Sequence, residues 1–555
     1  MLASRRSDIH TEGADSWLCL PNLILLTGTA IGIFLMLRNI GQPWIGMGDG
    51  DGALFSSMAR NYIKFGVNAL HWGQLVTFEE ISQPAGAYYL HHPPLFPLLV
   101  AAFFSIFGES ETATRLVSVL ATLLTAALLF LIVRRENGTR GGMLATFFFL
   151  TYPSTIVFGR KPGYEALSLC FVVLAIWLYQ RYREQPVTLR RYLLFAAIAL
   201  ATATDWPAFF LPAALVLHTL VYRKDQKLDW GLLTGLVLLP SLVLVAFLWS
   251  VYSVDRAAIV DLLHQGMAYM GLVSPDSAIA QHFVEARITF TTKEYIFRLL
   301  RNVTLNFGMI PFMLALFGLA ALRQAKEFRS IVLVLVVVAL GDCVLFWRSL
   351  YFHLWWQHLL TAPLAILSAV AVNSLLTLIS QNSEAGRSSN LRTALLAALA
   401  LPILVTLVYN VWQLSQEQTR MLPTSQLEPA NFIPLLGEKI RSRTAIGDQI
   451  LTNLAPLPLE SSPYERILPY YARRVFEPEI TNPQQIMNYL GNPASTAGNV
   501  YFLLWSDKGH KDDGALSAWL SHHAIPSEIS VAGQRFGFFK LEVRSLRATR
   551  TNRGD

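Results

Sequence analysis

The chain has few charged residues and very few cysteines. Only 15% of its 555 residues are Asp, Glu, Lys or Arg, whereas 53% are hydrophobic, and the mean hydropathy is +0.41. A chain of this composition cannot bury all of its apolar residues in soluble domains, so most of it is expected to lie in lipid. Cys19, Cys170 and Cys343 fall inside apolar segments. The sequence therefore predicts neither a disulfide framework nor a thiolate metal site.

The chain also lacks a concentrated basic tract. It has 44 basic and 37 acidic residues, an excess of seven, and the basic residues are spread over short loops. This distribution is typical of proteins whose membrane topology is set by loop charge, and it argues against nucleic acid as a partner.

Apolar segments long enough to span a membrane recur along the chain. A span needs about 20 apolar residues. About eleven such segments begin near residues 20, 112, 141, 163, 191, 207, 230, 302, 330, 353 and 392. We expect residues 1–412 to form a polytopic α-helical membrane domain.

The short basic loops alternate along this domain and set its orientation. They lie at residues 134–136, 181–191, 223–227, 323–329 and 387–392, and Arg5 and Arg6 join them on one side. Because basic loops stay in the cytoplasm, the N-terminus is predicted to be cytoplasmic and the C-terminus extracytoplasmic. Compact loops and the absence of cysteine outside apolar segments favour a bacterial inner membrane.

Three polar regions then face outward. In the first, residues 39–111, the segments 53–65 and 93–107 are expected to be helices along the membrane surface. A span at 93–107 would invert every later loop. The second region, residues 253–300, shows no recognisable motif or evident structure, and we expect it to close over a site when a substrate binds.

The third region, residues 413–555, is predicted to be a small extracytoplasmic α/β domain. It has strand-like runs at 449–453, 472–476, 499–505 and 536–541, with helical stretches at 483–490 and 514–522. It lacks a Gly-rich phosphate loop and a catalytic serine elbow. A supporting or recognition role is therefore expected for it.

The first outer region begins with an acidic motif, Asp49-Gly50-Asp51-Gly52. Asp and Gly are common in turns, so a plain turn is the alternative reading. A calcium loop is excluded because Ala53 and Arg60 stand where further acidic ligands are required.

The same region continues with His91-His92-Pro93-Pro94. The prolines could simply start a helix while the histidines sit at the interface. Imidazole also suits transition metals, so a divalent cation is left open as a cofactor, although adjacent histidines point in different directions.

Basic and aromatic residues mark two further outer edges. Arg160 and Lys161 precede Glu165, and a later aromatic hairpin carries Arg348 and His353. Interfacial anchoring is the alternative for all of them. An outer basic pair is nevertheless uncommon under the positive-inside rule, which favours a functional role for Arg160 and Lys161.

Taken in order, several motifs resemble the GT-C superfamily of glycosyltransferases, in the branch that contains protein O-mannosyltransferases and lipid A aminoarabinose transferases. They are Asp51, Ala59-Arg60-Asn61, Tyr89-Leu90-His91-His92-Pro93-Pro94-Leu95, Phe107-Gly108, Thr114-Arg115-Leu116 and Gly159-Arg160-Lys161-Pro162-Gly163-Tyr164-Glu165. The resemblance covers roughly residues 40–375. The chain departs from it at Gly52, where many relatives have Glu, and at His92, where the usual motif is Lys-Pro-Pro.

The resemblance implies an inverting transferase that takes a sugar from a polyprenyl-phosphate donor at the outer face, with a catalytic Asp at the start of the first outer loop. Such a displacement needs a carboxylate to accept the proton of the incoming hydroxyl, and Asp51 is our candidate. The acceptor would be a cell-envelope lipid, a glycan or a protein.

The leaving phosphate needs its charge neutralised. Candidates for this role and for shaping the donor pocket are Asp49, His91, His92, Arg160, Lys161, Glu165, Arg348 and His353.

A transporter or flippase of a lipid-linked or small-molecule substrate is the alternative function. Transporters often carry ionisable or Gly/Pro-broken positions at mid-membrane depth and have paired halves. Here the candidate charges cluster at the predicted outer edge and the two halves do not repeat. The enzyme interpretation is therefore favoured.

Overall fold

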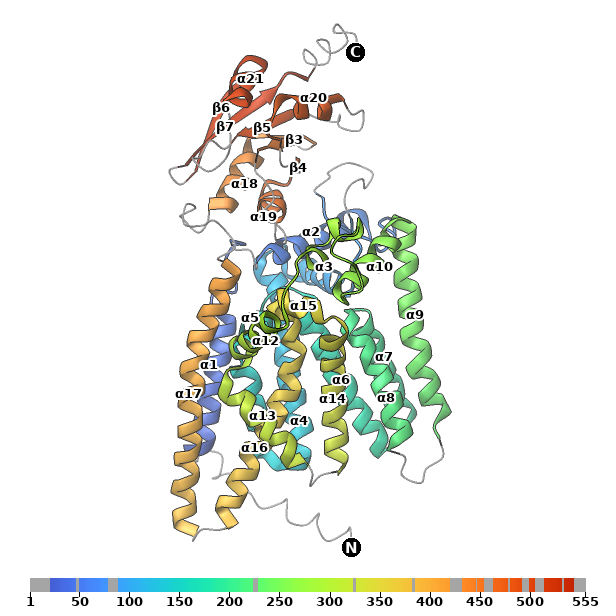
Figure 1. The fold of residues 1–555 in the computed structure, drawn as a ribbon, viewed down its shortest axis with the longest axis vertical. Coiled ribbons are helices and arrows are strands. Elements are labelled where there is room, and N and C mark those ends of the chain that lie inside the picture. Colours follow the sequence, from blue (N-terminus) through green and yellow to red (C-terminus); the bar gives the residue numbers. More distant parts are fainter. Residues whose placement is uncertain are drawn as a thin grey trace.

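A long helical bundle carries a small α/β domain at one end (Figure 1). The computed structural model describes residues 20–45, 49–77, 88–222, 228–322, 326–381, 385–419, 432–445, 447–453, 463–477, 480–491, 499–504, 514–531 and 534–543. We call the end of the bundle nearest the α/β domain the domain end.

The bundle is built from helices that coincide with all eleven expected apolar segments. They are α1 (Leu20–Leu37), α4 (Glu111–Thr151), α5 (Pro153–Phe158), α6 (Tyr164–Glu184), α7 (Thr188–Thr202), η4 (Trp206–Phe209), α8 (Phe210–Val221), α9 (Trp230–Val254), α12 (Thr292–Phe307), α13 (Met309–Ala321), α14 (Lys326–Leu345), α15 (Trp347–Phe352), η7 (Leu354–Leu360), α16 (Thr361–Gln381) and α17 (Ala385–Thr419). Within the described ranges, six helices are long and apolar enough to cross a membrane, or seven if α12 and α13, bent by 96°, count as one span.

Two of the expected segments form the arms of a hairpin within α4. The helix breaks at Gly138, whose φ of 69° is in the left-handed region that glycine adopts readily. Beyond the break the chain folds back. The hydrogen bond that Thr146 Oγ1 donates to the carbonyl of Ala126 at 3.4 Å shows that the two arms lie side by side. In a straight helix these two residues would be about 30 Å apart.

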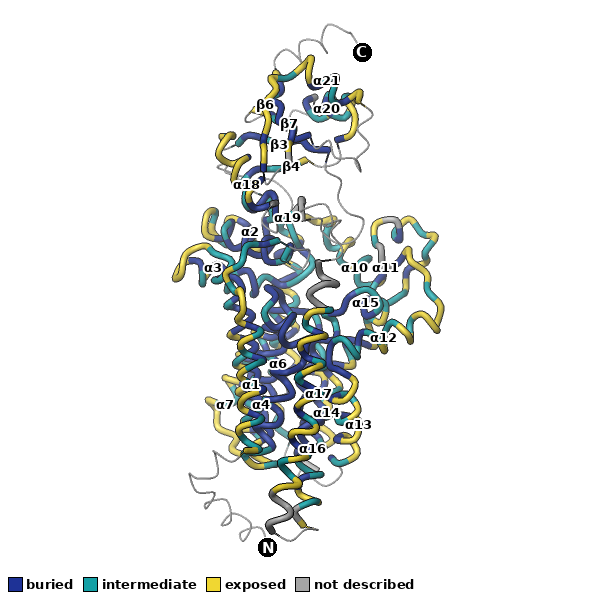
Figure 2. Tube along the Cα trace, turned by 90° about the vertical axis from the view of Figure 1, so that its left-hand side faces the viewer, coloured by how far each residue is buried: buried dark blue, intermediate teal, exposed yellow. Residues whose placement is uncertain are grey.

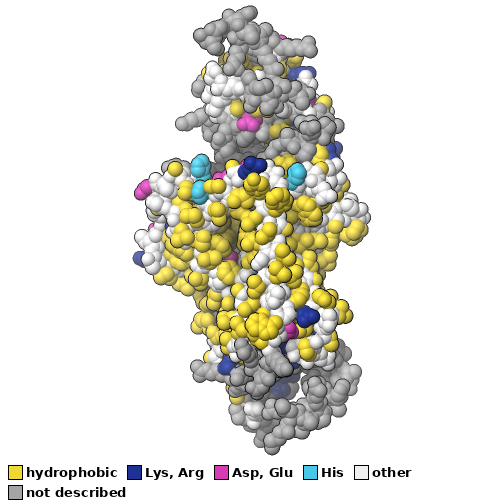
Figure 3. Space-filling view, turned by 90° about the vertical axis from the view of Figure 1, so that its right-hand side faces the viewer, with side chains coloured by type: hydrophobic (Ala, Val, Ile, Leu, Met, Phe, Trp, Pro, Cys, Tyr) yellow, Lys and Arg dark blue, Asp and Glu magenta, His cyan; other side chains and the backbone are white. Residues whose placement is uncertain are grey.

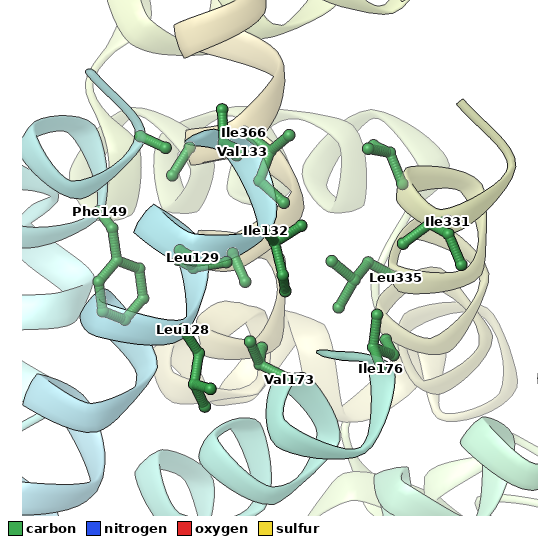
Figure 4. Close-up of a cluster of buried hydrophobic side chains, with 14 of the residues drawn as sticks. Leu128, Leu129, Ile132, Val133, Phe149, Val173, Ile176, Ile331, Leu335 and Ile366 are labelled. Atoms are coloured by element: carbon green, nitrogen blue, oxygen red, sulfur yellow. The ribbon is translucent and has the colours of Figure 1, made fainter. Parts of the chain in front are cut away.

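The interior of the bundle is a continuous apolar core. Figure 4 shows Ile132 of α4 facing Ile176 of α6 and Leu335 of α14, and all three are buried. Figure 2 shows buried residues inside the bundle and exposed ones on its outer faces. Large apolar side chains such as Trp249 on α9 are exposed there, as a lipid-facing surface requires. Figure 3 shows the resulting apolar band, with histidine and basic side chains at its upper edge.

Glycine permits the close approach of two bundle helices, α13 and α16. A Cβ at Gly318 of α13 would clash with the backbone carbonyl of Leu367 on α16. Small residues at helix interfaces are the usual means of close packing in membranes.

We expect Gly318→Ala to destabilise the bundle by about 1–3 kcal/mol, because the clash is with backbone and cannot be relieved by a rotamer change. The apparent midpoint of thermal unfolding in detergent should fall by several degrees. Gly266→Ala is the matched control, since Gly266 lies inside α10 (Ala258–Tyr269) and an added Cβ there would meet only open space. The packing account is wrong if both variants unfold at the same temperature.

Short elements cover the domain end of the bundle. The first polar region forms α2 (Gly50–Phe65) and α3 (Leu95–Phe107), joined through the small hairpin of β1 (Gln74–Leu75) and β2 (Tyr88–Tyr89). The helices expected at 53–65 and 93–107 are therefore present. The expectation of no evident structure in residues 253–300 is wrong: the segment contains α10, η5 (Ile279–His282), α11 (Val284–Arg287) and the start of α12.

The C-terminal domain has a five-stranded sheet with the order β4-β3-β5-β7-β6. Pairing is parallel between β3 and both β4 and β5, and antiparallel between β7 and both β5 and β6. Its elements are α18 (Phe432–Arg443), β3 (Gln449–Thr452), α19 (Pro463–Ala472), β4 (Val475–Glu477), α20 (Pro483–Gly491), β5 (Val500–Leu504), α21 (Ala515–His523), β6 (Ala524–Val531) and β7 (Gln534–Leu541). The expected class, a polytopic helical membrane protein with a small α/β domain, is confirmed.

Two strands of this domain differ from the sequence-based expectation. The strand expected at 472–476 starts only at Val475, because Ala472 still belongs to α19. The sequence also missed β6, an edge strand in which Ile529 and Val531 are the buried residues. An edge strand with most of its side chains exposed lacks the apolar alternation that reveals a strand.

Candidate active site

Asp51 lies in the first turn of α2, at the domain end of the bundle. One carboxylate oxygen, Oδ2, is 2.6 Å from Nζ of Lys161, and the other, Oδ1, is 2.5 Å from a guanidinium nitrogen of Arg466. Burial alone would raise the pKa of Asp51, but the two cations outweigh it and lower that pKa below its usual value. Asp51 is therefore held as a carboxylate by two cations from distant parts of the chain.

The residue after Asp51 explains one departure from the GT-C pattern. Any Cβ at position 52 would clash with the ring of Trp44, which is fully buried. The Glu that the GT-C resemblance would place at this position has no room here. Gly52 thus lets α2 pack directly against Trp44.

Asp49 has a different partner from Asp51. Its Oδ1 is 3.1 Å from Arg115, a buried residue of α4 that also donates to the carbonyls of Ile40 and Gln42. The Arg115 guanidinium stacks over Trp44 at 4.1 Å. The sequence predicts a substrate-binding role for Asp49, whereas these contacts favour a role in fixing the segment that leads into α2.

Lys161 and Arg160 are neighbours in the link between α5 and α6, but they point to different places. Lys161 is buried, and its ammonium lies 4.3 Å from the ring centre of Trp355 as well as beside Asp51. Arg160 donates to the backbone carbonyls of Arg38 and Asn39. Lys161 is thus the member of the pair that reaches Asp51.

The two adjacent histidines also have different partners. His92 Nδ1 is 2.9 Å from Asp205 Oδ1, and its ring stacks on Tyr164 with centres 4.5 Å apart. His91 is hydrogen-bonded to Gln265 of α10. Burial lowers the pKa of His91, which favours its neutral form near pH 7 and suits a hydrogen-bonding role better than charge neutralisation.

Stacked aromatic side chains connect the two histidines to the rest of the site. Tyr89 stacks on both His91 and His92, with centres 5.2 Å and 5.9 Å apart. The Tyr164 hydroxyl donates to the Gln74 side chain, whose amide in turn donates to the carbonyl of His92. This network fixes the His-His-Pro-Pro turn beside the first turn of α6, where Glu165 lies.

His353 and Arg348 occupy the aromatic hairpin at α15 and η7. The His353 ring lies 4.7 Å from that of Trp355, which is the same ring that faces Lys161. Arg348 donates to the carbonyl of Ile288 and lies over Phe290 at 5.2 Å. The structure thus links His353 to the Asp51 cluster through one ring and places Arg348 against the 253–300 segment.

Sequence reasoning missed Arg466, on α19 of the C-terminal domain. It lies 415 residues from Asp51 along the chain, and no local motif marks it. The only available signal was its position in a predicted outward-facing domain.

Across the part of the chain that the structure describes, no three His, Cys, Asp or Glu side chains gather closely enough to hold a metal ion. Within the described residues, His92 and Asp205 form a pair that no third such group joins closely enough to make a ligand set for a divalent cation.

Known proteins resemble the chain in part of its sequence and in nearly all of its fold. Residues 91–250 match the family described as dolichyl-phosphate-mannose-protein mannosyltransferase. An uncharacterized protein from Aquifex aeolicus is 28% identical over 141 residues, which cover 25% of this chain and only 28% of that protein.

Among solved structures, ArnT from Cupriavidus metallidurans bound to undecaprenyl phosphate superposes with a TM-score of 0.57 and 16% identity, covering 95% of this chain and 98% of ArnT. The oligosaccharyltransferase AglB from Archaeoglobus fulgidus, in complex with an inhibitory peptide and a dolichol-phosphate, gives 0.51 and 13%, covering 93% of this chain and 74% of AglB. The resemblance seen in the sequence is confirmed: this chain is a multi-pass membrane protein with the GT-C glycosyltransferase fold, and it resembles the branch that contains ArnT and the protein mannosyltransferases.

Proposed function

We propose that the protein is an inverting glycosyltransferase that moves a sugar from a polyprenyl-phosphate donor to a hydroxyl acceptor. The observation that carries the proposal is the Asp51 carboxylate held by Lys161 and Arg466 at one end of a GT-C bundle. Such a cluster offers both a proton acceptor and cations for a phosphate. The lipid phosphates bound to ArnT and AglB support a donor of this class.

In the reaction we propose, the acceptor hydroxyl oxygen attacks the anomeric carbon. The bond from that carbon to the phosphate oxygen breaks, and its electron pair stays on the phosphate. Asp51 takes the hydroxyl proton, as the base does in inverting glycoside hydrolysis. Attack from the face opposite the phosphate inverts the anomeric centre.

The surrounding residues divide into roles that follow from their contacts. Lys161 would bind the phosphate, because its ammonium already neutralises an anion at this place. His91, His92 and the rings stacked on them would line the sugar, and His353 would border the same space through Trp355. Glu165 would help to position Lys161, four residues before it.

The membrane orientation is part of the proposal. With the N-terminus in the cytoplasm, the domain end and residues 413–555 lie outside a bacterial inner membrane, where lipid-linked sugars would be used. The basic loops support this orientation through the positive-inside rule. The acceptor is a cell-envelope lipid, a glycan or a protein.

A transfer assay with purified protein tests the proposal. The protein in nanodiscs is given a panel of polyprenyl-phosphate sugars with and without a cell-envelope extract, and free polyprenyl phosphate is measured by mass spectrometry. We expect release from one panel member, dependent on the extract. If no member is consumed but proteoliposomes move a lipid-linked sugar between leaflets, the transporter alternative replaces the enzyme.

A further inference from the structure

We propose that Arg466 of the C-terminal domain is a ligand of the donor phosphate, so that the active site is complete only when this domain is docked on α2. This inference rests on the proposed transferase function. It assigns a binding role to a side chain outside the membrane bundle.

The first observation is that one carboxylate holds two cations. Lys161 and Arg466 contact different oxygens of Asp51 and come from the α5–α6 link and from α19. Lys161 is nearly buried, with 7% of its side chain exposed, whereas Arg466 is 23% exposed and Asp51 29%. Arg466 therefore lies on the accessible side of the cluster, where an incoming anion would arrive.

The second observation is that other contacts dock the domain beside Arg466. The Tyr471 hydroxyl accepts the backbone N–H of Trp44 at 2.9 Å and donates to Glu111 at 2.5 Å. Trp44 and Ala53 share a buried apolar cluster with Ile467 and Leu468 of α19. These contacts hold α19 against the start of α2 and fix where the Arg466 guanidinium can reach.

An exposed ion pair also crosses the edge of this interface. Glu109 pairs with Arg60 of α2 and, at 3.4 Å, with Arg473 just after α19. The Arg60 guanidinium also lies 4.7 Å from the ring centre of Tyr470. Arg473 is thus an arginine at the same interface whose partner is Glu109 and not Asp51, which makes it a matched control for Arg466.

The chemistry of the donor explains why a second cation is useful. A polyprenyl phosphosugar is a phosphodiester with one negative charge, and the polyprenyl phosphate that leaves is a monoester with a charge near −2 at neutral pH. Negative charge therefore grows on the phosphate during the reaction. Two cations aimed at it stabilise the transition state more than the bound donor.

The same geometry suggests how the base becomes available. Without donor, the Asp51 carboxylate is the anion that both cations hold. A bound phosphate would compete for them, and Arg466, the more exposed of the two, would turn from Asp51 to the phosphate. Asp51 would then be a stronger base when donor is present than when the site is empty.

The test is direct binding of polyprenyl phosphate to the full-length protein in nanodiscs, with polyprenol as the uncharged control ligand. We expect Arg466→Gln to weaken polyprenyl-phosphate binding about tenfold or more, the usual cost of losing one charge-assisted hydrogen bond. Arg466→Lys should recover part of the loss. Arg473→Gln should stay within about twofold of wild type, and each variant's thermal unfolding is measured to show that it is folded.

Three results would overturn the inference. If folded Arg466→Gln binds polyprenyl phosphate as well as wild type does, Arg466 is not a phosphate ligand, while the proposed function stands. If Arg473→Gln loses as much affinity as Arg466→Gln, docking of the domain and not the Arg466 charge is what matters. Failure of wild type itself to prefer polyprenyl phosphate over polyprenol would remove the proposed function, and this inference with it.

Discussion

Asp51→Asn is expected to lower the rate of sugar transfer by roughly a hundredfold to ten-thousandfold, the range that general-base catalysis contributes. The amide keeps the shape of the side chain but cannot take the proton of the acceptor hydroxyl. Binding of polyprenyl phosphate should be kept or strengthened, because the variant leaves Lys161 and Arg466 without the anion that they now share. Single-turnover transfer and equilibrium binding, measured on the same preparation, check both parts.

The matched control for this prediction is Glu109→Gln, which removes a carboxylate at the same end of the molecule. Glu109 pairs with Arg60 and Arg473 at the domain interface. We expect its transfer rate to stay within about twofold of wild type, since exposed ion pairs contribute little. A folded Asp51→Asn variant that transfers sugar at the wild-type rate would show that another group accepts the proton.

Lys161→Gln is expected to lower kcat/KM by roughly tenfold to a hundredfold through the loss of a charged phosphate ligand. It should also change the pH dependence. Burial raises the pKa of the Asp51 carboxyl, whereas the nearby Lys161 ammonium lowers it. Removing this cation therefore raises the pKa of Asp51. The Asp51 carboxylate then takes up its proton at higher pH. The acid limb of the kcat/KM profile, which reports the free enzyme, therefore shifts to higher pH.

Lys161→Arg is the control for the pH shift, because it keeps a positive charge at the position. Its acid limb should stay near that of the wild type even if its rate falls. An acid limb that is the same in Lys161→Gln and wild type would mean that Asp51 does not limit the reaction at low pH.

The length of the apolar segments was the strongest signal in the sequence, and it predicted the helices of the bundle well. All eleven expected segments are helical, and Gly138 reverses the chain between two of them. The α/β domain was predicted in outline, but β6 was missed because few of its side chains are buried. Periodicity reports burial, so it fails where an element stays exposed.

The candidate site was predicted in its parts but not in its pairings. Asp51 and Lys161 were both named, yet 110 residue positions separate them and only the fold brings them within 2.6 Å. Asp49 was predicted to help bind the substrate, whereas it pairs with Arg115. Arg466 had no local signal, because its contact with Asp51 depends on how a separate domain docks.

The most direct test of the two-cation site is a cryo-electron microscopy structure of the protein with polyprenyl phosphate bound. The account predicts the phosphate within about 4 Å of Nζ of Lys161, the ordinary ion-pair distance, with the Arg466 guanidinium turned from Asp51 toward it. A phosphate bound beside Arg348, with both cations still on Asp51, would contradict the account.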